Sequence, residues 1–265
     1  MQYPITQKQH GLGWVRDIPD QRDLIFEAPR VLPPAKLPRV VDLRADCPPV
    51  YDQGMLGSCT AQALASAFDF NRKKQAQDFM FPSRLFIYWN ERAIEGTIDS
   101  DAGAMIRDGV KVLVKLGTPK ERTWPYDIGR FTEKPSKKAF REAEKNQAIS
   151  YQRILRPRNN RLQDMLICLS LGFPFVTGFT VYESFESEKV AKTGIVPMPD
   201  SSERILGGHA ILVVGYNQHT RRFICRNSWG IAWGDDGDCY LPFEYLEDAG
   251  LSSDQWTLRS VELGD

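Results

Sequence analysis

The sequence has no excess of charge of either sign. Lysine plus arginine and aspartate plus glutamate both number 34 among 265 residues, so the formal net charge is zero. Proteins that bind the phosphate backbone of nucleic acids carry clustered basic residues. A nucleic-acid partner is therefore not expected. The hydrophobic content of 42% is enough for a large core, in one big domain or in two lobes.

Long apolar runs are missing as well. No stretch approaches the roughly 18 residues that a membrane-spanning helix needs. The first ten residues, MQYPITQKQH, lack the charged and then apolar order of a signal peptide. We expect a soluble chain with no membrane partner. Cytoplasmic residence is the default expectation, and secretion would require export information outside this chain.

Cysteine pairs of the metal-binding kind are also absent. The five cysteines include no C-x-x-C pair and the chain has only three histidines, so a zinc cluster is not expected. An odd number of cysteines leaves at least one thiol free. A scattered cysteine in a chain of this size is usually a small buried hydrophobe. The cysteines are Cys47, Cys59, Cys168, Cys225 and Cys239.

The first part of the chain consists of two regions with different sequence patterns. Residues 1–39 contain six prolines and no sustained helical period, which predicts an extended lead-in. After Val40, apolar residues recur at helical spacing in 59–74 and helical stretches follow at 83–95 and 104–117. The last of these ends at a glycine, a residue that commonly stops a helix. The first half is therefore expected to be mainly helical.

The later half alternates short apolar runs with turns. Runs rich in β-branched and aromatic residues predict antiparallel strands at 174–182, 209–217, 221–229 and 238–243. A helical half followed by a stranded half favours an α+β protein with segregated layers and a cleft at their boundary. The segment EKPSKKAFREAEK at 133–145 is interpreted as a solvated charged stretch.

Cys59 has a position that favours a reactive thiol. It lies at the start of the predicted helix, where unpaired backbone N–H groups and the helix dipole stabilise a thiolate and lower the thiol pKa. Gln53 lies six residues upstream, across a glycine-containing turn. Its side-chain amide would return to the same place and, with the Cys59 backbone N–H, donate to a tetrahedral intermediate.

His209 heads an apolar strand behind two glycines, a place where a lone histidine is more often structural. Asn227 changes that balance, because it opens the turn after the next strand. Two successive antiparallel strands would bring these residues within reach of each other. An asparagine oxygen that accepts from the ring would fix the tautomer of the histidine and hold the ring toward the thiol.

Three segments carry a resemblance to a known family. DQGMLGSCTAQA, GGHAILVVGY and RNSWGIAWGDDG resemble, in this order, the cysteine, histidine and asparagine blocks of the papain/cathepsin-like C1 cysteine peptidases. The resemblance runs from about residue 41 through YLPFEYL. It implies a two-lobed papain-like fold, with a helical left lobe, an antiparallel β-barrel-like right lobe and the active-site cleft between them. The implied domains are a pro-like segment, 1–39, and a peptidase domain, 40–265.

The resemblance also implies catalytic roles. Cys59 matches the nucleophile, His209 the base, Asn227 the asparagine that orients it and Gln53 the oxyanion glutamine. The thiolate would attack a peptide carbonyl, the imidazolium would protonate the leaving amine, and water would hydrolyse the thioester. No metal or organic cofactor is needed. Activity is expected to fall at acidic pH, where the thiolate is protonated, and at alkaline pH, where the imidazolium is deprotonated.

Further residues are expected to bind the peptide substrate. Ala102 and Gly103 match the paired glycines that align the peptide, and Trp229 matches the tryptophan that shields the histidine–asparagine hydrogen bond. Small residues at Ala104, Gly178 and Gly208 would leave a roomy pocket for an apolar or aromatic side chain at the residue preceding the cleaved one. The full set is Gly57, Ser58, Ala102, Gly103, Ala104, Met105, Gly178, Gly208 and Trp229.

The sequence departs from the family pattern at two places. Leu56 stands where most animal and plant members have a disulfide-forming cysteine, and Thr60 replaces an aromatic residue after the nucleophile. These departures indicate a divergent, bacterial-type branch with fewer disulfides. Cys225 and Cys239 lie on strands expected to be neighbours, so a bridge and two separate buried thiols are both compatible with the sequence.

The N-terminal segment is a candidate intramolecular inhibitor, although it is short for a propeptide and lacks long helices. We expect GLGWVRDIPDQRDLIF, residues 11–26, to pack on the surface and partly cover the active site. Its expected anchors are Trp14, Leu24, Ile25 and Phe26. The alternative is a permanent structural arm. His10 and His219 receive only structural interpretations, in the lead-in and in an exposed turn.

Two other functions use the same residues. An acyltransferase or a deamidase would direct this thiol at a non-peptide amide, since the constellation defines acyl transfer but not the acceptor. A binding module on a peptidase scaffold would have lost turnover. All four catalytic groups are present, which favours an enzyme. No histidine lies between Cys59 and Gly103 to form an occluding loop, so endopeptidase action is the preferred prediction.

Overall fold

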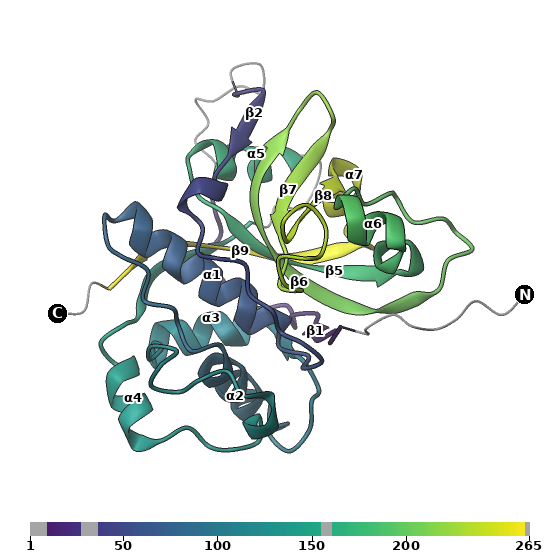
Figure 1. The fold of residues 1–265 in the computed structure, drawn as a ribbon. Coiled ribbons are helices and arrows are strands. Elements are labelled where there is room, and N and C mark those ends of the chain that lie inside the picture. Colours follow the sequence, from purple (N-terminus) through teal and green to yellow (C-terminus); the bar gives the residue numbers. More distant parts are fainter. Residues whose placement is uncertain (1–9, 28–36, 155–160, 263–265) are drawn as a thin grey trace, which may run out of the picture.

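The helices formed before residue 144 gather on one side of the molecule, and most strands, with later helices around them, lie on the other (Figure 1). The structure is a computed structural model that describes residues 10–27, 37–154 and 161–262. Parts of the predicted N-terminal segment, residues 1–9 and 28–36, lie outside the described residues. The segregation of helices and strands confirms the predicted α+β class and the two lobes.

The helical lobe is built on α1, which spans Cys59–Lys74 and is buried over most of its length. Its alanines allow close packing against α2 (Arg84–Glu95), α3 (Ile106–Lys115) and the sheet. The Ser83 hydroxyl caps α2 by accepting from the Phe86 backbone N–H. The predicted helices are confirmed, except that residues 104–105 form strand β3 ahead of α3.

The second lobe is a seven-stranded sheet in which every pair of neighbours is antiparallel. The strand order is β4-β9-β5-β6-β7-β8, and β2 pairs with β6. The strands are β2 (Val40–Asp42), β4 (Ala148–Arg153), β5 (Phe175–Tyr182), β6 (Ile205–Asn217), β7 (Arg222–Arg226), β8 (Asp238–Pro242) and β9 (Ser252–Val261). Short helices pack around it: α5 (Arg161–Ser170), α6 (Glu188–Thr193) and α7 (Phe243–Glu247). The four predicted strands are present at β5 to β8.

The interpretation of residues 133–145 as a solvated charged stretch is confirmed for nearly all their charged side chains, which are exposed, but it is incomplete. This stretch contains α4, Lys137–Ala143, whose N-terminus is capped by the Ser136 hydroxyl. Ala139 and Ala143 are fully buried, and the ring of Phe140 packs edge-on against Phe86, with centroids 5.0 Å apart. Residues four positions apart share one helix face, so two alanines are enough to anchor a helix whose other faces are charged.

All five cysteines are buried and free. Cys225 and Cys239 lie directly opposite each other on β7 and β8, so the predicted neighbourhood is confirmed and the side chains are separate thiols. Among the described residues, no helix combines the length and the apolar character that a membrane span needs.

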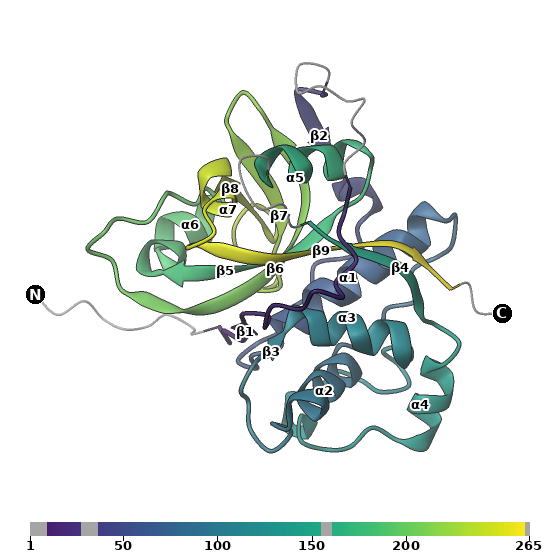
Figure 2. The same ribbon diagram turned by 180° about the vertical axis from the view of Figure 1, so that it is seen from behind.

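Residues 10–27 pass between the two lobes. Strand β1, Trp14–Val15, pairs in parallel with β3, Ala104–Met105, on the helical lobe. From β1 the purple trace crosses the back of the molecule toward β4 (Figure 2), where the Phe26 N–H donates to the Arg153 carbonyl at 2.8 Å. Within 10–27 there is no helix, as expected for an extended lead-in.

Candidate active site

Cys59 is the first residue of α1, as predicted, and its side chain is fully buried. Burial raises the pKa of its thiol to about 12, while the backbone amides of Ala210, Gly13 and Thr60 act in the opposite direction. The expectation of a lowered pKa is therefore wrong for this covered state. The helix N-terminus favours the anion, but the loss of water around the sulfur outweighs it.

His209 and Asn227 come together from β6 and the end of β7, as predicted. Asn227 Oδ1 lies 2.7 Å from His209 Nε2 and accepts from the Ser228 backbone N–H at 2.8 Å. Because Oδ1 accepts, Nε2 carries the proton, which leaves Nδ1 of a neutral ring as an acceptor. Nδ1 has no hydrogen-bond partner among the described residues. Burial lowers the pKa of His209 to about 4.

Gln53 is fixed by Ser228 on one side. Its Oε1 accepts from the Ser228 hydroxyl at 2.6 Å, so Nε2 faces the other way. There Nε2 donates to the carbonyl oxygens of Leu56 and of Gly11, both at 2.9 Å. Gly11 belongs to the N-terminal segment. The predicted oxyanion donor therefore already binds a peptide carbonyl, the group that becomes the oxyanion in acyl transfer.

Trp229 lies beside the histidine, with ring centroids 4.9 Å apart. Another of its neighbours is His10, which stacks on it at 4.3 Å with an interplanar angle of 7°. The structural role expected for His10 is thus a packing contact inside the cleft, a place that the sequence did not predict. Nothing in the sequence around His10 marks it as a cleft residue, because the stacking depends on where the whole segment lies. His219 is exposed in its turn, as predicted.

The backbone of the N-terminal segment fits the cleft through glycines. The Gly13 carbonyl accepts from the Ala104 N–H at 2.7 Å. A Cβ atom at Gly13 would lie 1.8 Å from the Gly57 carbonyl oxygen, and one at Gly103 would lie 2.1 Å from the Gly13 oxygen. Gly103 also has a φ of +72°, which favours glycine. Gly13 therefore lies in direct contact with two predicted substrate-binding residues.

The predicted side-chain pocket is filled by Trp14. A Cβ at Gly178 would lie 1.9 Å from Cε2 of its indole, and a Cβ at Gly208 would lie 2.3 Å from the Trp14 carbonyl oxygen. Trp14 and Val15 pair with Ala104 and Met105 in register. The small residues thus make room for an aromatic side chain, which is 9% exposed.

Other residues predicted to bind substrate or to anchor the segment do not contact Gly13 or Trp14 in this way. The Ser58 hydroxyl is buried at 2.6 Å from Tyr126 Oη, and Ala102 is exposed beside the cleft. Of the predicted anchors, Phe26 is buried at 2% exposure, whereas Leu24 and Ile25 are 54% and 38% exposed. Leu24 and Ile25 are therefore wrong as anchors. The backbone attaches this part, since the Arg153 N–H donates to the Leu24 carbonyl at 2.7 Å.

Comparison with known proteins gives one consistent family. A sequence profile of the papain family cysteine proteases matches residues 37–254. An uncharacterized peptidase C1-like protein of Acanthamoeba polyphaga mimivirus is 40% identical over 271 residues, 95% of this chain and 87% of that protein. A cathepsin B-like protein of Giardia intestinalis is 28% identical over 212 residues, 72% of this chain and 62% of that protein.

Solved structures agree. Xylellain, a cysteine protease from Xylella fastidiosa, superposes with a TM-score of 0.86 and 40% identity, covering 98% of this chain and 99% of that chain. A cysteine protease from Carica candamarcensis shares the fold, with a TM-score of 0.62 and 20% identity over 84% of this chain and 100% of that one.

Proposed function

Since the chain belongs to the papain family of cysteine proteases, hydrolases that act on peptides and proteins, we propose that it is an endopeptidase with Cys59 as nucleophile. One observation carries the proposal. Residues 11–14 of the N-terminal segment lie in the cleft as a peptide: Gln53 donates to the Gly11 carbonyl, the Gly13 amide faces the Cys59 thiol, and the Trp14 carbonyl lies against Gly208, which precedes His209 in the chain. The residues 1–39 and 40–265 are proposed as segment and peptidase domain.

The reaction follows from the positions of these groups. The Cys59 sulfur forms a bond to the scissile carbonyl carbon, and the resulting oxyanion accepts from Gln53 Nε2 and the Cys59 backbone N–H. The imidazolium of His209 gives its Nδ1 proton to the leaving amine as the C–N bond breaks. Water, deprotonated by the same nitrogen, then attacks the thioester, and the thiol leaves.

Asn227 and Trp229 act through the histidine. The 2.7 Å hydrogen bond from Nε2 to Asn227 Oδ1 holds Nδ1 as the atom that exchanges protons with the thiol. The Trp229 ring, only 4% exposed, covers this bond on one side. A dry hydrogen bond holds the ring orientation more firmly than one open to water.

The N-terminal segment is proposed to inhibit the enzyme. It runs from His10 on Trp229, past Gly13 at the thiol, to Trp14 in the side-chain pocket. A substrate fills that pocket with a residue on the amino-terminal side of the cleaved bond, so it runs in the opposite direction. The segment therefore blocks the cleft without presenting its own peptide bonds correctly. Burial under it also favours the neutral thiol and imidazole over the reactive ion pair.

A labelling experiment tests the catalytic proposal. The full-length Gly13→Val variant, in which the cleft is opened, is treated with a cysteine-directed epoxide. Its intact mass is then measured by mass spectrometry. We expect one label, lost with Cys59→Ala and retained with the matched control Cys168→Ala. Cys168 is equally buried but lies in α5 of the other lobe.

Cleavage of a fluorogenic dipeptide amide and of unrelated denatured proteins is measured in parallel. Labelling of Cys59 with cleavage of both supports the endopeptidase. Labelling without cleavage of any protein would favour an acyltransferase or deamidase on the same scaffold. Failure of Cys59 to react in the opened variant would leave a non-catalytic binding module.

A further inference from the structure

A cluster of buried charges joins the N-terminal segment to the body beyond the catalytic cleft. Arg107 donates from Nε and Nη2 to the two carboxylate oxygens of Asp23 at 2.9 and 2.6 Å. Arg153 Nη1 binds the same Asp23 at 2.7 Å, and Arg153 Nη2 binds Asp254 at 2.6 Å. These four side chains are each less than 10% exposed. The cluster is thus a desolvated network of charges.

Asp17 occupies a carboxylate-binding niche in this cluster. Its Oδ1 accepts from the backbone N–H of Arg107 at 3.0 Å, near the start of α3, and its Oδ2 accepts from Trp256 Nε1 at 2.9 Å. The Arg153 guanidinium lies 4.0 Å from Oδ2. We call the donors of Arg107, Arg153 and Trp256 the Asp17 niche. Each of these groups presents a donor or a positive charge to the carboxylate, whereas burial and the neighbouring Asp254 carboxylate raise the pKa of Asp17 to about 6.

The charges of the cluster are divided unequally between segment and body. Asp17 and Asp23 belong to the segment, whereas Arg107, Arg153 and Asp254 belong to the body. When the segment leaves, two arginines therefore remain with one carboxylate. An arginine deprived of its partner in a low-dielectric site attracts anions strongly.

The Asp17 niche adjoins the pocket that Trp14 fills. Asp254 Oδ2 accepts from Trp14 Nε1 at 3.2 Å and from the Asp17 backbone N–H at 2.8 Å. Asp254 Oδ2 thus contacts both Trp14, in the side-chain pocket, and Asp17, in the niche. Asp17 follows Trp14 on the side away from Cys59, which is the side toward which the amino-terminal residues of a substrate extend.

We propose that the Asp17 niche is a substrate subsite, which binds an aspartate or glutamate side chain at the fourth or fifth residue before the cleaved bond. The inference rests on the proposed function, because the niche is open to substrate only after the segment has left the cleft. In the covered enzyme, Asp17 holds the place of the substrate carboxylate. The ligand class is an acidic peptide.

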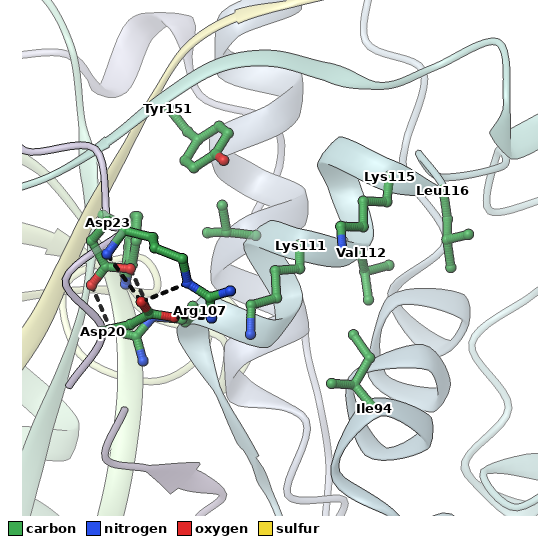
Figure 3. A pocket seen from close by; sticks show the side chains of 12 residues that line it. Asp20, Asp23, Ile94, Arg107, Lys111, Val112, Lys115, Leu116 and Tyr151 are labelled. Atoms are coloured by element: carbon green, nitrogen blue, oxygen red, sulfur yellow. Dashed lines mark hydrogen bonds and ion pairs between the residues drawn. The ribbon is translucent and has the colours of Figure 1, made fainter. Parts of the chain in front are cut away.

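The surroundings have the sign that this subsite needs. A cavity of about 620 Å³ lies beside it, lined on the body by Arg107, Lys111, Lys115 and Trp256 and on the segment by Asp20, Arg22 and Asp23 (Figure 3). The body thus contributes three cationic side chains to this wall, and the carboxylates come from the segment. Removal of the segment joins the cavity to the Asp17 niche and leaves a basic approach to it.

The test uses two full-length variants. Gly13→Val displaces the segment backbone from the cleft, and the double variant with Asp17→Asn also removes the resident carboxylate. Internally quenched peptides carry glutamate, glutamine or lysine at the fourth or fifth position before the cleaved bond and are otherwise identical. In the double variant we expect kcat/KM for the glutamate peptide to exceed that for the glutamine peptide by about tenfold. The ratio should be smaller with Asp17 present, because Asp17 competes for the niche.

A second readout does not depend on turnover. Peptidyl epoxides with the same glutamate or glutamine residue label Cys59, and the labelling rate is followed by intact mass. Equal rates for the two epoxides, or a preference for lysine, would overturn the proposed subsite even if cleavage proceeds normally. Labelling that favours glutamate, with no cleavage of either peptide, would support the subsite and overturn the endopeptidase.

Discussion

The two halves of the N-terminal segment are attached by different means. Residues 10–14 fit the cleft by shape, through a stacked ring, a close glycine contact and an indole in a pocket. Residues 17–23 are held by ion pairs to Arg107 and Arg153. Shape determines which groups are covered, and charge adds affinity at a distance from the thiol. The first half should therefore tolerate substitution least.

The largest effect is expected from Gly13→Val. A Cβ at this position would lie 1.8 Å from the Gly57 carbonyl oxygen, so the segment cannot stay in place. Overpacking of this kind costs about 1–3 kcal/mol, so turnover of a dipeptide amide by the full chain should rise by up to about 100-fold. Gly129→Ala is the control, since its Cβ would meet only the Asp127 side chain, at 3.3 Å. An unchanged rate in a folded Gly13→Val variant would mean that the segment does not inhibit.

Asp23→Asn probes the second half. It removes the charge that both Arg107 and Arg153 contact, and hydrogen bonds to charged groups contribute about 1.5–3 kcal/mol. We expect turnover to rise about tenfold, since the cleft contacts remain. Asp20→Asn is the matched control, because the partner of the Asp20 carboxylate among the described residues is Arg22, in the same segment. Equal effects of the two substitutions would show that the buried network adds nothing to segment affinity.

Local patterns predicted much of the candidate active site. The start of α1 at Cys59 follows from helical spacing, and the approach of His209 to Asn227 follows from two successive strands. Both depend on residues close in the chain or on a short connection. The pocket that Trp14 fills was also predicted, because the small residues Gly178 and Gly208 leave space there. The prediction did not depend on which side chain occupies that space.

Long-range burial could not be predicted in the same way. Asp17, Asp23, Arg107 and Arg153 have the composition of ordinary surface charges, and their partners lie 84 or more residues apart. Burial of a charge depends on the fold and not on its neighbours in the chain. The raised pKa of Cys59 has the same origin, since the segment that excludes water is distant in sequence.

A smaller effect is expected from His10→Ala. Stacking of aromatic rings contributes about 0.5–1.5 kcal/mol, so loss of the contact with Trp229 should raise turnover about threefold. His219→Ala is the matched control, because His219 is exposed in a turn of the β6–β7 connection. If both variants turn over substrate at the wild-type rate, His10 does not contribute to segment binding, and the part of the segment held by its shape begins after His10.

The smallest effect concerns pH. In the covered enzyme, burial raises the pKa of Cys59 from 9.0 to about 12 and lowers that of His209 from 6.5 to about 4, and we expect the segment to account for part of both shifts. Because covering favours the thiol, its contribution to segment binding is complete below pH 9.0 and declines as the pH rises toward 12.

Because covering also favours the neutral imidazole, that contribution is complete above pH 6.5 and declines as the pH falls toward 4. The segment should therefore bind most tightly between these limits. The rate of Cys59 alkylation by neutral iodoacetamide measures this, with Gly13→Val as reference. The wild-type thiol should titrate above pH 9.0, and the opened variant at or below it. Coincident titration curves would show that the segment does not exclude water from the thiol, and the distinction between its two halves would then lose its basis.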